Sequence, residues 1–437
     1  MSSFDMNELL NCMHCGFCLP SCPTFQQTGL ETYSPRGRIA LMKGVAEGTL
    51  PVDAEFEQNM YACLGCRACE TACPAGVQYG ALIEDARELI EDRKKARKRT
   101  SFARSATLKH LFMHPQRIRW GGHVLWAMQA SGLQKFAEQT GLMKVLPREM
   151  AQMQAAVDTV ASPAKRKRRQ EVVGPDSTSR RRKELDAPAA NRKPAMRVGT
   201  FTGCIMDVMF YDTNQATARL LAKAGCTVVF ARHQVCCGAL HAHSGEKADA
   251  MELAKQNIVA FEQADVELIV NNAGGCGAAL KEYAHWFKDD PDWADRSRQF
   301  VSKMRDISEL LAELPPLSFT KPVEARVTYQ DSCHLAHGQG VRNQPRELIR
   351  SIPGVDYVEL QNADSCCGSA GIYNITNYDM SMRILDEKMQ QVANTKANLV
   401  VTTNPGCLLQ MKKGILDAGL SERVQAVHIV DLLNQAL

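Results

Sequence analysis

Eight cysteines near the start of the chain repeat one spacing twice, C-x-x-C-x-x-C-x-x-x-C-P. The first run is Cys12, Cys15, Cys18 and Cys22 before Pro23, and the second is Cys63, Cys66, Cys69 and Cys73 before Pro74. In such runs the first three thiolates bind one iron–sulfur cubane, and the fourth, before the proline, binds the other. The runs therefore predict two [4Fe–4S] clusters, one on Cys12, Cys15, Cys18 and Cys73, the other on Cys63, Cys66, Cys69 and Cys22. Zinc knuckles and disulfides are the alternatives, but neither needs four thiols per run.

Eight further cysteines form a duplicated set in the second half of the chain. The first copy is Cys204, Cys236, Cys237 and Cys276, and the second is Cys333, Cys366, Cys367 and Cys407. The offsets between matching cysteines are 129, 130 and 131 residues, and such constancy indicates a repeated unit. Four convergent thiolates in each copy predict a metal site, for which an iron–sulfur cluster and zinc are both suitable. Only Cys226 falls outside these sets, and it is predicted to be a buried small hydrophobe.

Strand-like and helical stretches alternate in both copies. The predicted strands are Val198–Phe201, Thr227–Phe230, Leu268–Asn271, Val327–Tyr329, Tyr357–Leu360 and Leu399–Thr402, and the predicted helices include Ala216–Ala224, Lys247–Gln263 and Met380–Val392. This alternation predicts a parallel sheet flanked by helices in each copy. The cysteines follow the strands, so we expect them at the carboxyl ends of the sheet, near helix N-termini that favour thiolates. Gly238 and Gly368 are expected to turn the backbone tightly after each cysteine pair.

The first hundred residues carry helical signals around the two cysteine runs. Ser34 and Pro35 suit the start of one helix, and Asp53 suits the cap of another that leads to Cys63. From 82 to 90 apolar residues recur on one helical face, with the acids Glu84, Asp85, Glu88 and Asp92 opposite. These signals favour an α-helical ferredoxin domain with two clusters.

Composition and charge limit the classes of function. The chain has 437 residues and a net charge of +4, but residues 161–194 hold eleven Lys/Arg against four Asp/Glu, so the remainder carries about −3. That balance excludes a general nucleic-acid binder, and the proline-containing basic segment is predicted to be a flexible linker. Attraction to an anionic lipid surface or to an acidic partner is the alternative. No signal peptide or membrane span is evident, and reduced thiols predict a cytoplasmic protein.

Five regions are predicted. They are an α-helical ferredoxin domain (1–99), a helical cap or connector (100–160), the basic linker (161–194) and two α/β domains (195–320 and 321–437). The helices of the second region are expected to cap the ferredoxin domain. Because Trp120 stands beside Arg117, Arg119 and His123, an element that meets a membrane or a partner subunit is the alternative.

The motifs carry a resemblance to a known family. Cys12-Met-His-Cys-Gly-Phe-Cys18, Ser34-Pro-Arg-Gly-Arg-Ile39, Asn272-Ala-Gly-Gly-Cys-Gly277 and Ser365-Cys-Cys-Gly-Ser-Ala-Gly371 are the most telling stretches. The chain resembles the family of glycolate oxidase iron–sulfur subunits, whose paired CCG domains are related to heterodisulfide reductase. The resemblance implies an electron-transfer subunit of an oxidoreductase acting on CH–OH donors, with two [4Fe–4S] clusters and a further cluster or metal in one or both CCG domains. It also implies a hetero-oligomer in which a flavin-binding subunit oxidises glycolate to glyoxylate, with electrons passing toward a quinone or another acceptor at the inner face of the membrane.

Two related functions remain as alternatives. One is a catalytic subunit like that of heterodisulfide reductase, and the other is the electron carrier of a lactate or glycerol-3-phosphate dehydrogenase. The CCG domains of heterodisulfide reductases typically end in C-x-x-C, but this chain has Ala273 and Asn404 at the first of those positions, which argues against disulfide cleavage.

No catalytic residue is predicted. His14, His233, His241, His243, His334 and His337 lie near cysteines and are interpreted as hydrogen-bonding or surface residues, with His334 the strongest candidate for more, because Asp331 is close by in sequence. The chain lacks a flavin or nucleotide signature, since Gly199-Thr-Phe-Thr-Gly203 has no third glycine.

Overall fold

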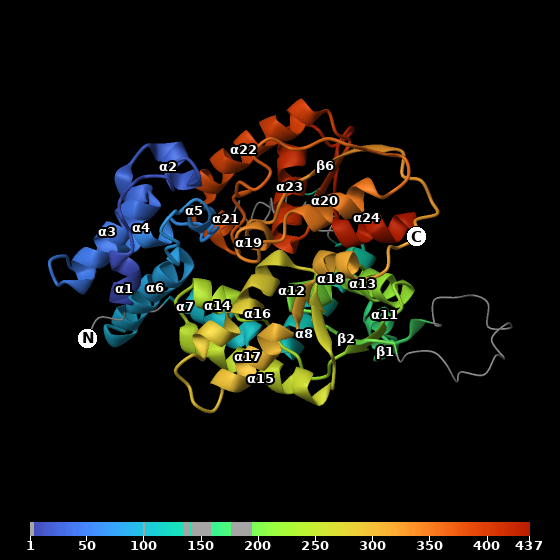
Figure 1. Cartoon of the computed structure of the whole chain (residues 1–437), viewed down its shortest axis with the longest axis horizontal. Helices are drawn as coiled ribbons and strands as arrows, with labels where there is room; N and C mark the ends of the chain where they lie inside the picture. Colours follow the sequence, from blue (N-terminus) through green and yellow to red (C-terminus); the bar gives the residue numbers. More distant parts are fainter. Residues whose placement is uncertain (1–3, 99–100, 134–139, 141–158, 176–194) are drawn as a thin grey trace.

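The computed structural model describes residues 4–98, 101–133, 140, 159–175 and 195–437. A helical N-terminal unit lies at one side of the molecule, and two α/β units, one above the other in Figure 1, make up the rest. This arrangement confirms the predicted fold class, a helical N-terminal region followed by two duplicated parallel-sheet units.

The N-terminal unit consists of short helices packed around one apolar core. Its elements are α1 (Met6–Leu10), α2 (Pro23–Thr28), η1 (Glu31–Tyr33), α3 (Pro35–Ala46), α4 (Ala54–Tyr61), α5 (Ala68–Thr71) and α6 (Tyr79–Ala96). The predicted caps form: the Ser34 hydroxyl accepts from the backbone N–H of Gly37, and the Asp53 carboxylate accepts from that of Phe56. Met42 and Met60 are fully buried in the core. The first cysteine run lies in the loop between α1 and α2, and the second lies between α4 and α6, with Cys69 inside the short helix α5.

The first α/β unit contains a sheet with strand order β1-β3-β2-β4-β5, in which only β1 (Val172–Val173) is antiparallel to its neighbour. Its elements are β2 (Arg197–Thr200), α12 (Ile205–Met209), α13 (Tyr211–Lys223), β3 (Thr227–Phe230), α14 (Ala239–His243), α15 (Lys247–Gln263), β4 (Leu268–Asn271), α16 (Gly274–Trp286), α17 (Ala294–Ser302), β5 (Met304–Asp306) and α18 (Ile307–Glu313).

The second α/β unit repeats this plan with the wholly parallel order β7-β6-β8-β9. Its elements are β6 (Ala325–Tyr329), α19 (Cys333–Ala336), α20 (Asn343–Arg350), β7 (Val355–Tyr357), α21 (Tyr373–Thr376), α22 (Tyr378–Thr395), β8 (Leu399–Thr402), α23 (Pro405–Asp417), β9 (Gln425–His428) and α24 (Ile429–Ala436).

Most predicted strands are confirmed, and two differences stand out. The strand predicted over 357–360 ends instead at Tyr357. A fourth parallel strand in each unit, β5 or β9, was not predicted because it is only three or four residues long and runs straight into a helix. Asp306 and His428 end these strands and cap the helices that follow, so the sequence signal of the helix conceals the strand.

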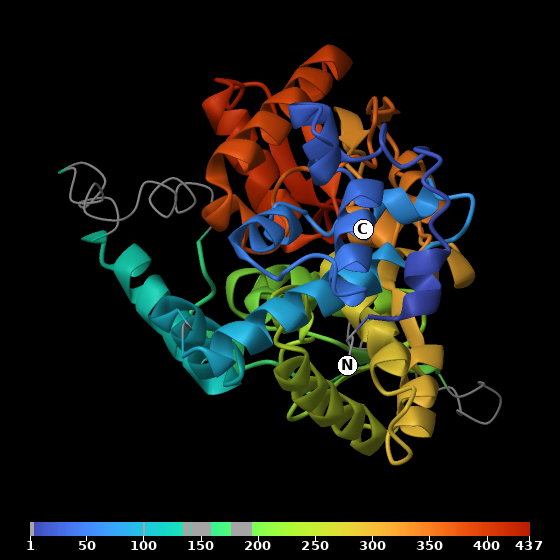
Figure 2. The same cartoon turned by 90° about the vertical axis from the view of Figure 1, so that its left-hand side faces the viewer.

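The connecting segment contains α7 (Phe102–Ser105), the π-helix η2 (Ala106–Phe112) and α8 (Pro115–Ala130). These elements are helical, as expected. Arg104 of α7 pairs with Glu91 of the N-terminal unit, while later residues of the segment pack on the first α/β unit. Phe112 and Ile118 are buried in the core of the first α/β unit, and Figure 2 shows α8 (teal) leading away from the N-terminal unit.

The basic segment is also not a simple tether where the structure describes it. It forms α11 (Pro163–Lys167) and β1 (Val172–Val173), and β1 pairs with β3 at the edge of the first sheet. The prediction of a flexible linker is therefore wrong for residues 163–173, because two valines after the charge run complete a sheet edge. Residues 176–194 of that prediction lie outside the described residues.

The two α/β units share a core and face each other with their cysteine edges. Val198 and Leu220 of the first unit are buried in one apolar cluster with Val327 and Leu433 of the second. At the facing edges, the N–H of Gly274 donates to the Thr403 carbonyl at 3.0 Å. The cysteine sets of the two repeats are thereby brought to a common interface.

Candidate metal centres

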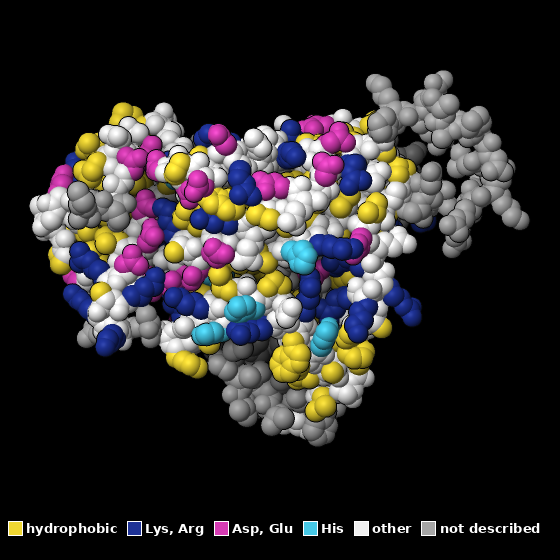
Figure 3. Space-filling model, turned by 90° about the horizontal axis from the view of Figure 1, so that it is seen from below, with side chains coloured by type: hydrophobic (Ala, Val, Ile, Leu, Met, Phe, Trp, Pro, Cys, Tyr) yellow, Lys and Arg dark blue, Asp and Glu magenta, His cyan; other side chains and the backbone are white. Residues whose placement is uncertain are grey.

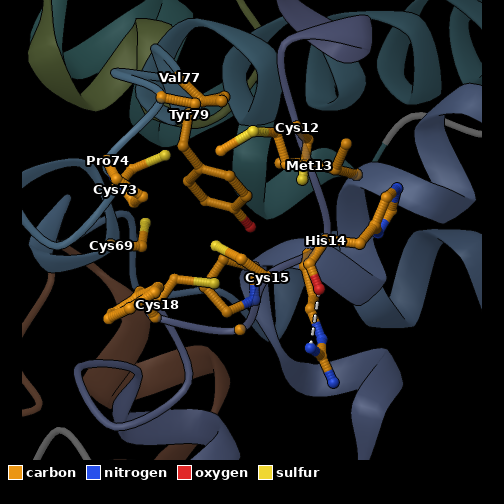
Figure 4. A pocket seen from close by; sticks show the side chains of 16 residues that line it. Cys12, Met13, His14, Cys15, Cys18, Cys69, Cys73, Pro74, Val77 and Tyr79 are labelled. Atoms are coloured by element: carbon orange, nitrogen blue, oxygen red, sulfur yellow. Dashed lines mark hydrogen bonds between the residues drawn. The ribbon is translucent and has the colours of Figure 1, made fainter.

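The first predicted cluster site is a hollow of about 430 Å³ in the N-terminal unit. Its lining includes the predicted ligands Cys12, Cys15, Cys18 and Cys73, and also Cys69 of the other set. Figure 4 shows these five cysteines gathered around the ring of Tyr79. Cys15 is solvent-exposed, so this site lies at the surface of the molecule.

The second predicted cluster site is a neighbouring hollow of about 290 Å³. It is lined by the predicted ligands Cys22, Cys63, Cys66 and Cys69. All four are buried. Because Cys69 lines both hollows, the two sites adjoin. Within the described residues, no three His, Cys, Asp or Glu side chains are grouped as for a single metal ion; the thiols surround these hollows instead.

Two buried arginines make the second hollow suitable for an anionic group. Burial raises the pKa of Cys63, but the charges of Arg38 and Arg87 outweigh it, so that this pKa lies below its usual value. Arg38 has no exposed surface, lines the hollow and keeps one buried nitrogen, Nη1, without a hydrogen-bond partner. A thiolate-ligated iron–sulfur cluster is anionic, so a buried guanidinium with a spare donor beside four thiols fits such a cluster.

The stretch Ser34-Pro-Arg-Gly-Arg38 builds the walls of both hollows. Pro35 lines the two of them. Arg36 donates from Nη1 to the carbonyl of His14 at 3.0 Å and pairs with Glu31, which fixes the first cysteine loop. Gly37 is required because a Cβ there would lie 1.9 Å from the Glu31 carbonyl oxygen. Arg38 then donates from Nε to the carbonyl of Asn59 at 2.8 Å, inside the unit.

The cysteines of the first α/β unit form a row of interacting thiols. Cys204 interacts with Cys236, Cys236 with Cys237, and Cys237 with Cys276. Cys236 accepts from its neighbours and from the backbone at Gly238, and these interactions hold its pKa well below the usual value. All four predicted residues are thus brought together.

The second α/β unit repeats this row. Cys333 interacts with Cys366, Cys366 with Cys367, and Cys367 with Cys407. Cys367 accepts from Cys366 and Cys407, which lowers its pKa. Lys388 is almost fully buried nearby, and burial lowers its pKa to about 8 against the opposing effect of these thiols.

Both rows lie where parallel strands end and helices begin, as predicted. Cys276 stands in the first turn of α16, and Cys407 in the first turn of α23. Gly238 and Gly368 adopt φ values of +86° and +88° directly after the cysteine pairs. A Cβ at Gly368 would also lie 2.6 Å from the carbonyl oxygen of Ser381, so the turn needs glycine twice over.

The second cysteine run packs directly on the second α/β unit. Cys66 and Cys366 are buried in one apolar cluster, with Cys333 packed against it. His334 donates from Nε2 to the carbonyl of Gly65 at 2.9 Å, and Tyr373 donates to that of Ala62 at 3.0 Å. The buried hollow is therefore next to the second thiol row.

The two thiol rows also approach each other. Cys276 packs against the apolar cluster that contains Cys367 and Cys407. Asn404, where heterodisulfide reductases carry a cysteine, accepts from the N–H of Gly275 at 3.0 Å and donates to the sulfur of Cys407 at 3.6 Å. An amide thus takes the place of the missing thiol and joins the two units.

Four of the six histidines form hydrogen bonds, and His14 lines the first hollow. His241 contacts the Leu108 carbonyl, His337 contacts the Asp364 carbonyl, and His243 bonds Glu84 at 2.7 Å. Asp331 does not pair with His334, since both of its oxygens bind Arg346.

Sequence reasoning missed the roles of Arg38, Arg87, Lys388 and Asn404. Arg38 carried a usable signal, because it occupies the same helical face as Pro35 and Met42, where an apolar residue is expected. Lys388 gave none, since a lysine in a long helix is ordinarily solvated.

Family models match most of the chain. Residues 8–77 match a 4Fe-4S dicluster domain, residues 99–157 match the linker region of the glycolate oxidase iron-sulfur subunit, and residues 198–281 and 327–412 each match the cysteine-rich CCG domain.

Similar proteins agree with these matches. The probable glycolate oxidase iron-sulfur subunit of Bacillus subtilis is 48% identical over 99% of this chain and 95% of its own length. The glycolate oxidase iron-sulfur subunit of Escherichia coli is 30% identical over 98% of this chain and 93% of its own length. Lactate utilization protein A of Oceanobacillus iheyensis is 36% identical, over 55% of this chain and 97% of its own length. The chain therefore belongs to the family of glycolate oxidase iron–sulfur subunits.

Proposed function

We propose that this chain is the electron-transfer subunit of a glycolate dehydrogenase. It would accept electrons from a flavin-binding subunit that oxidises glycolate to glyoxylate and pass them to a quinone or another acceptor. Iron–sulfur clusters held by the cysteines supply one-electron transfer when bound. The proposed ligands are Cys12, Cys15, Cys18 and Cys73 for one cluster and Cys63, Cys66, Cys69 and Cys22 for the other, with metal sites in both thiol rows.

The observation that supports this proposal is the unbroken line of thiol sites through the molecule. The line begins at the exposed Cys15, and Cys69 joins the first hollow to the second. Cys66 shares an apolar cluster with Cys366, against which Cys333 packs. Cys407 belongs to the cluster against which Cys276 of the other row packs.

The chain's own residues perform the supporting tasks. Arg38 and Arg87 stabilise negative charge at the second hollow, and Lys388 does so beside the second thiol row. Apolar packing around Cys66 and Cys366 excludes water between two neighbouring sites. The backbone N–H of Gly65 donates to the sulfur of Cys63 at 3.3 Å, an interaction of the kind that tunes a thiolate ligand.

A lactate dehydrogenase carrier is the second candidate, favoured by the likeness to lactate utilization protein A. That likeness covers 55% of this chain, whereas the two glycolate oxidase subunits match nearly all of it. We therefore place glycolate first.

The test uses the anaerobically purified chain together with its flavoprotein partner. Glycolate, lactate and glycerol 3-phosphate are added separately, and bleaching of the iron–sulfur absorbance near 420 nm is followed by stopped flow. Bleaching with glycolate alone is the expected result. Bleaching only with lactate or glycerol 3-phosphate would reassign the donor, and a chain that dithionite itself cannot reduce would refute the electron-transfer role.

A further inference from the structure

One face of the first α/β unit is strongly basic. Residues 101–133 and 159–170 contain nine Lys/Arg and no Asp or Glu. These segments include α7, η2, α8 and α11, and His110, His114 and His123 add three imidazoles. Figure 3 shows Lys, Arg and His side chains gathered with hydrophobic ones on the lower right of the view, where acidic side chains are few.

Part of this charge has no counterpart among the described residues. Arg119 and Arg169 both pair with Asp207, and Arg166 interacts electrostatically with the same carboxylate. Three guanidinium groups thus share one carboxylate. The exposed side chains of Arg117, Lys167 and Arg168 form no ion pair with a described residue. The face therefore keeps a net positive charge.

Apolar side chains project from the same face. Trp120 is 69% exposed and Val124, one helical turn later, is 40% exposed. Arg117 and His123 lie on the same outer side of α8. The inner side of the helix is different, since Ile118 and Gly122 are buried against the first α/β unit. An exposed tryptophan on the same helix side as an exposed arginine is typical of an element that lies in the water–lipid interface.

The face lies one helix away from the first thiol row. Ile118 and Arg119 of α8 line a hollow of about 270 Å³ together with Cys204 and Cys236. The thiols of Cys204 and Cys236 therefore lie on the inner side of α8, and the basic face lies on its outer side. Within the described residues, no helix is long and apolar enough to cross a bilayer.

From these observations we propose that the face formed by α8 and α11 docks on an anionic phospholipid surface. Trp120 and Val124 enter the interface, while Arg117, Lys167 and Arg168 contact lipid phosphates. This inference rests on the proposed electron-transfer function, which it deepens by placing the thiol row of Cys204 and Cys236 nearest to the membrane. An acceptor dissolved in the bilayer, such as a quinone, would be reached from that end of the line of sites.

The test is co-sedimentation of the holoprotein with vesicles. Pure phosphatidylcholine vesicles are compared with vesicles containing about 30% phosphatidylglycerol, at low and high salt. We expect binding only to the anionic vesicles, weakened by salt. Lys167→Glu/Arg168→Glu should reduce it at least about tenfold, because each basic residue near such a surface contributes roughly 1 kcal/mol. Trp120→Ser should weaken vesicle binding as well. In the wild type, the indole fluorescence of Trp120 should shift to the blue on binding.

Matched controls come from the second α/β unit. Lys321→Glu/Arg423→Glu makes the same charge change at exposed sites, and Leu416→Ser removes an apolar side chain that is 50% exposed. These variants should bind like the wild type. Binding that neither α8 nor α11 variants alter would overturn the proposal, and so would absence of binding to anionic vesicles. Variants that bind vesicles normally but lose the flavoprotein partner would assign the face to a protein instead. Dithionite and flavoprotein reduction of each variant, measured in parallel, separates failure of docking from failure of electron transfer.

Discussion

At the residue scale, Arg38 is the side chain whose environment says most about what the second hollow holds. A guanidinium with no exposed surface and an unpartnered Nη1 is costly to bury unless an anion completes it. Arg38 lies among Cys22, Cys63 and Cys66 in the lining of that hollow. The second hollow is therefore suited to a negatively charged group. Neutral thiols alone would not provide that charge.

Arg38→Met should lower the reduction potential of the cluster at Cys63, because the positive charge stabilises the more negative, reduced state. An interaction of about 1–3 kcal/mol at an effective dielectric constant near 20 corresponds to roughly 40 to 130 mV for one electron. Redox titration followed by EPR measures the shift. Arg38→Lys keeps the charge and should stay close to the wild type; equal shifts in the two variants would mean that packing, not charge, sets the potential.

The crossed ligand sets give a second prediction at this scale. Cys73→Ser should alter the same EPR signal as Cys15→Ser, and Cys22→Ser the same signal as Cys66→Ser, since these pairs line the first and second hollows respectively. Spectra of the four reduced variants decide the matter. If Cys73→Ser affected the signal that Cys66→Ser affects, the crossing of the fourth ligands would be wrong.

At the element scale, the N-terminal unit is fixed to the first α/β unit through α6. Glu84 bonds His243 and Asp85 pairs with Lys247, so the acidic face of α6 is an interface. Helical periodicity predicts the helix and its apolar side, but it cannot tell whether the polar side faces water or a charged partner from a distant segment. For the same reason the sequence indicates the cysteine edges of the α/β units but not that these edges face each other. The ligand cysteines could be predicted because their spacing is a local sequence pattern. The interfaces could not, because they depend on contacts between residues far apart in the sequence.

The turn between α14 and α15 tests the α6 interface. Gly245 has a φ of +74°, and a Cβ there would lie 2.4 Å from the carbonyl oxygen of Arg87 in α6. Gly245→Ala should destabilise the protein by about 2–4 kcal/mol through backbone strain and collision. Gly225→Ala is the matched control, because its φ is +94° but the space around it is open. The melting temperature of Gly245→Ala should be well below that of Gly225→Ala. Equal melting temperatures would contradict the close approach of Gly245 to the carbonyl of Arg87.

The cap of α18 gives a pH-dependent prediction. Burial raises the pKa of Asp306 from 3.8 to about 6, although Ser308 donates to it. A raised pKa in the folded state means that the native protein binds more protons than the unfolded chain between about pH 4 and 6. The stability from this group is therefore present at low pH and is lost as the pH rises through 6.

Asp306→Asn keeps the capping acceptor but cannot ionise. Its melting temperature relative to wild type should rise between pH 5 and pH 8, with a change equivalent to on the order of 1–3 kcal/mol. Comparing two proteins at each pH cancels effects common to both. If the difference in melting temperature between the two proteins stayed constant across this pH range, the raised pKa of the buried Asp306 carboxyl would be contradicted.

At the scale of the whole molecule, the fold arranges its thiols as one path with two different ends. The first end is the exposed loop around Cys15 in the N-terminal unit, and the other is the thiol row beneath α8. The repeat in the sequence predicts two equivalent α/β units. The second unit contacts the second cysteine run through Cys333 and His334, whereas the first unit meets that run through the ion pair of Glu282 with Arg67, so the duplicated sites have unequal positions on the path.

Metal analysis of the anaerobically purified chain shows whether these cysteines hold iron–sulfur clusters. Iron, acid-labile sulfide and zinc are counted per chain, and the reduced protein is examined by low-temperature EPR. The expected result is at least about eight iron and eight sulfide per chain with two interacting cubane signals, and more iron if the two thiol rows are also filled. A chain that contains zinc in place of iron, and no EPR signal on reduction, would contradict it.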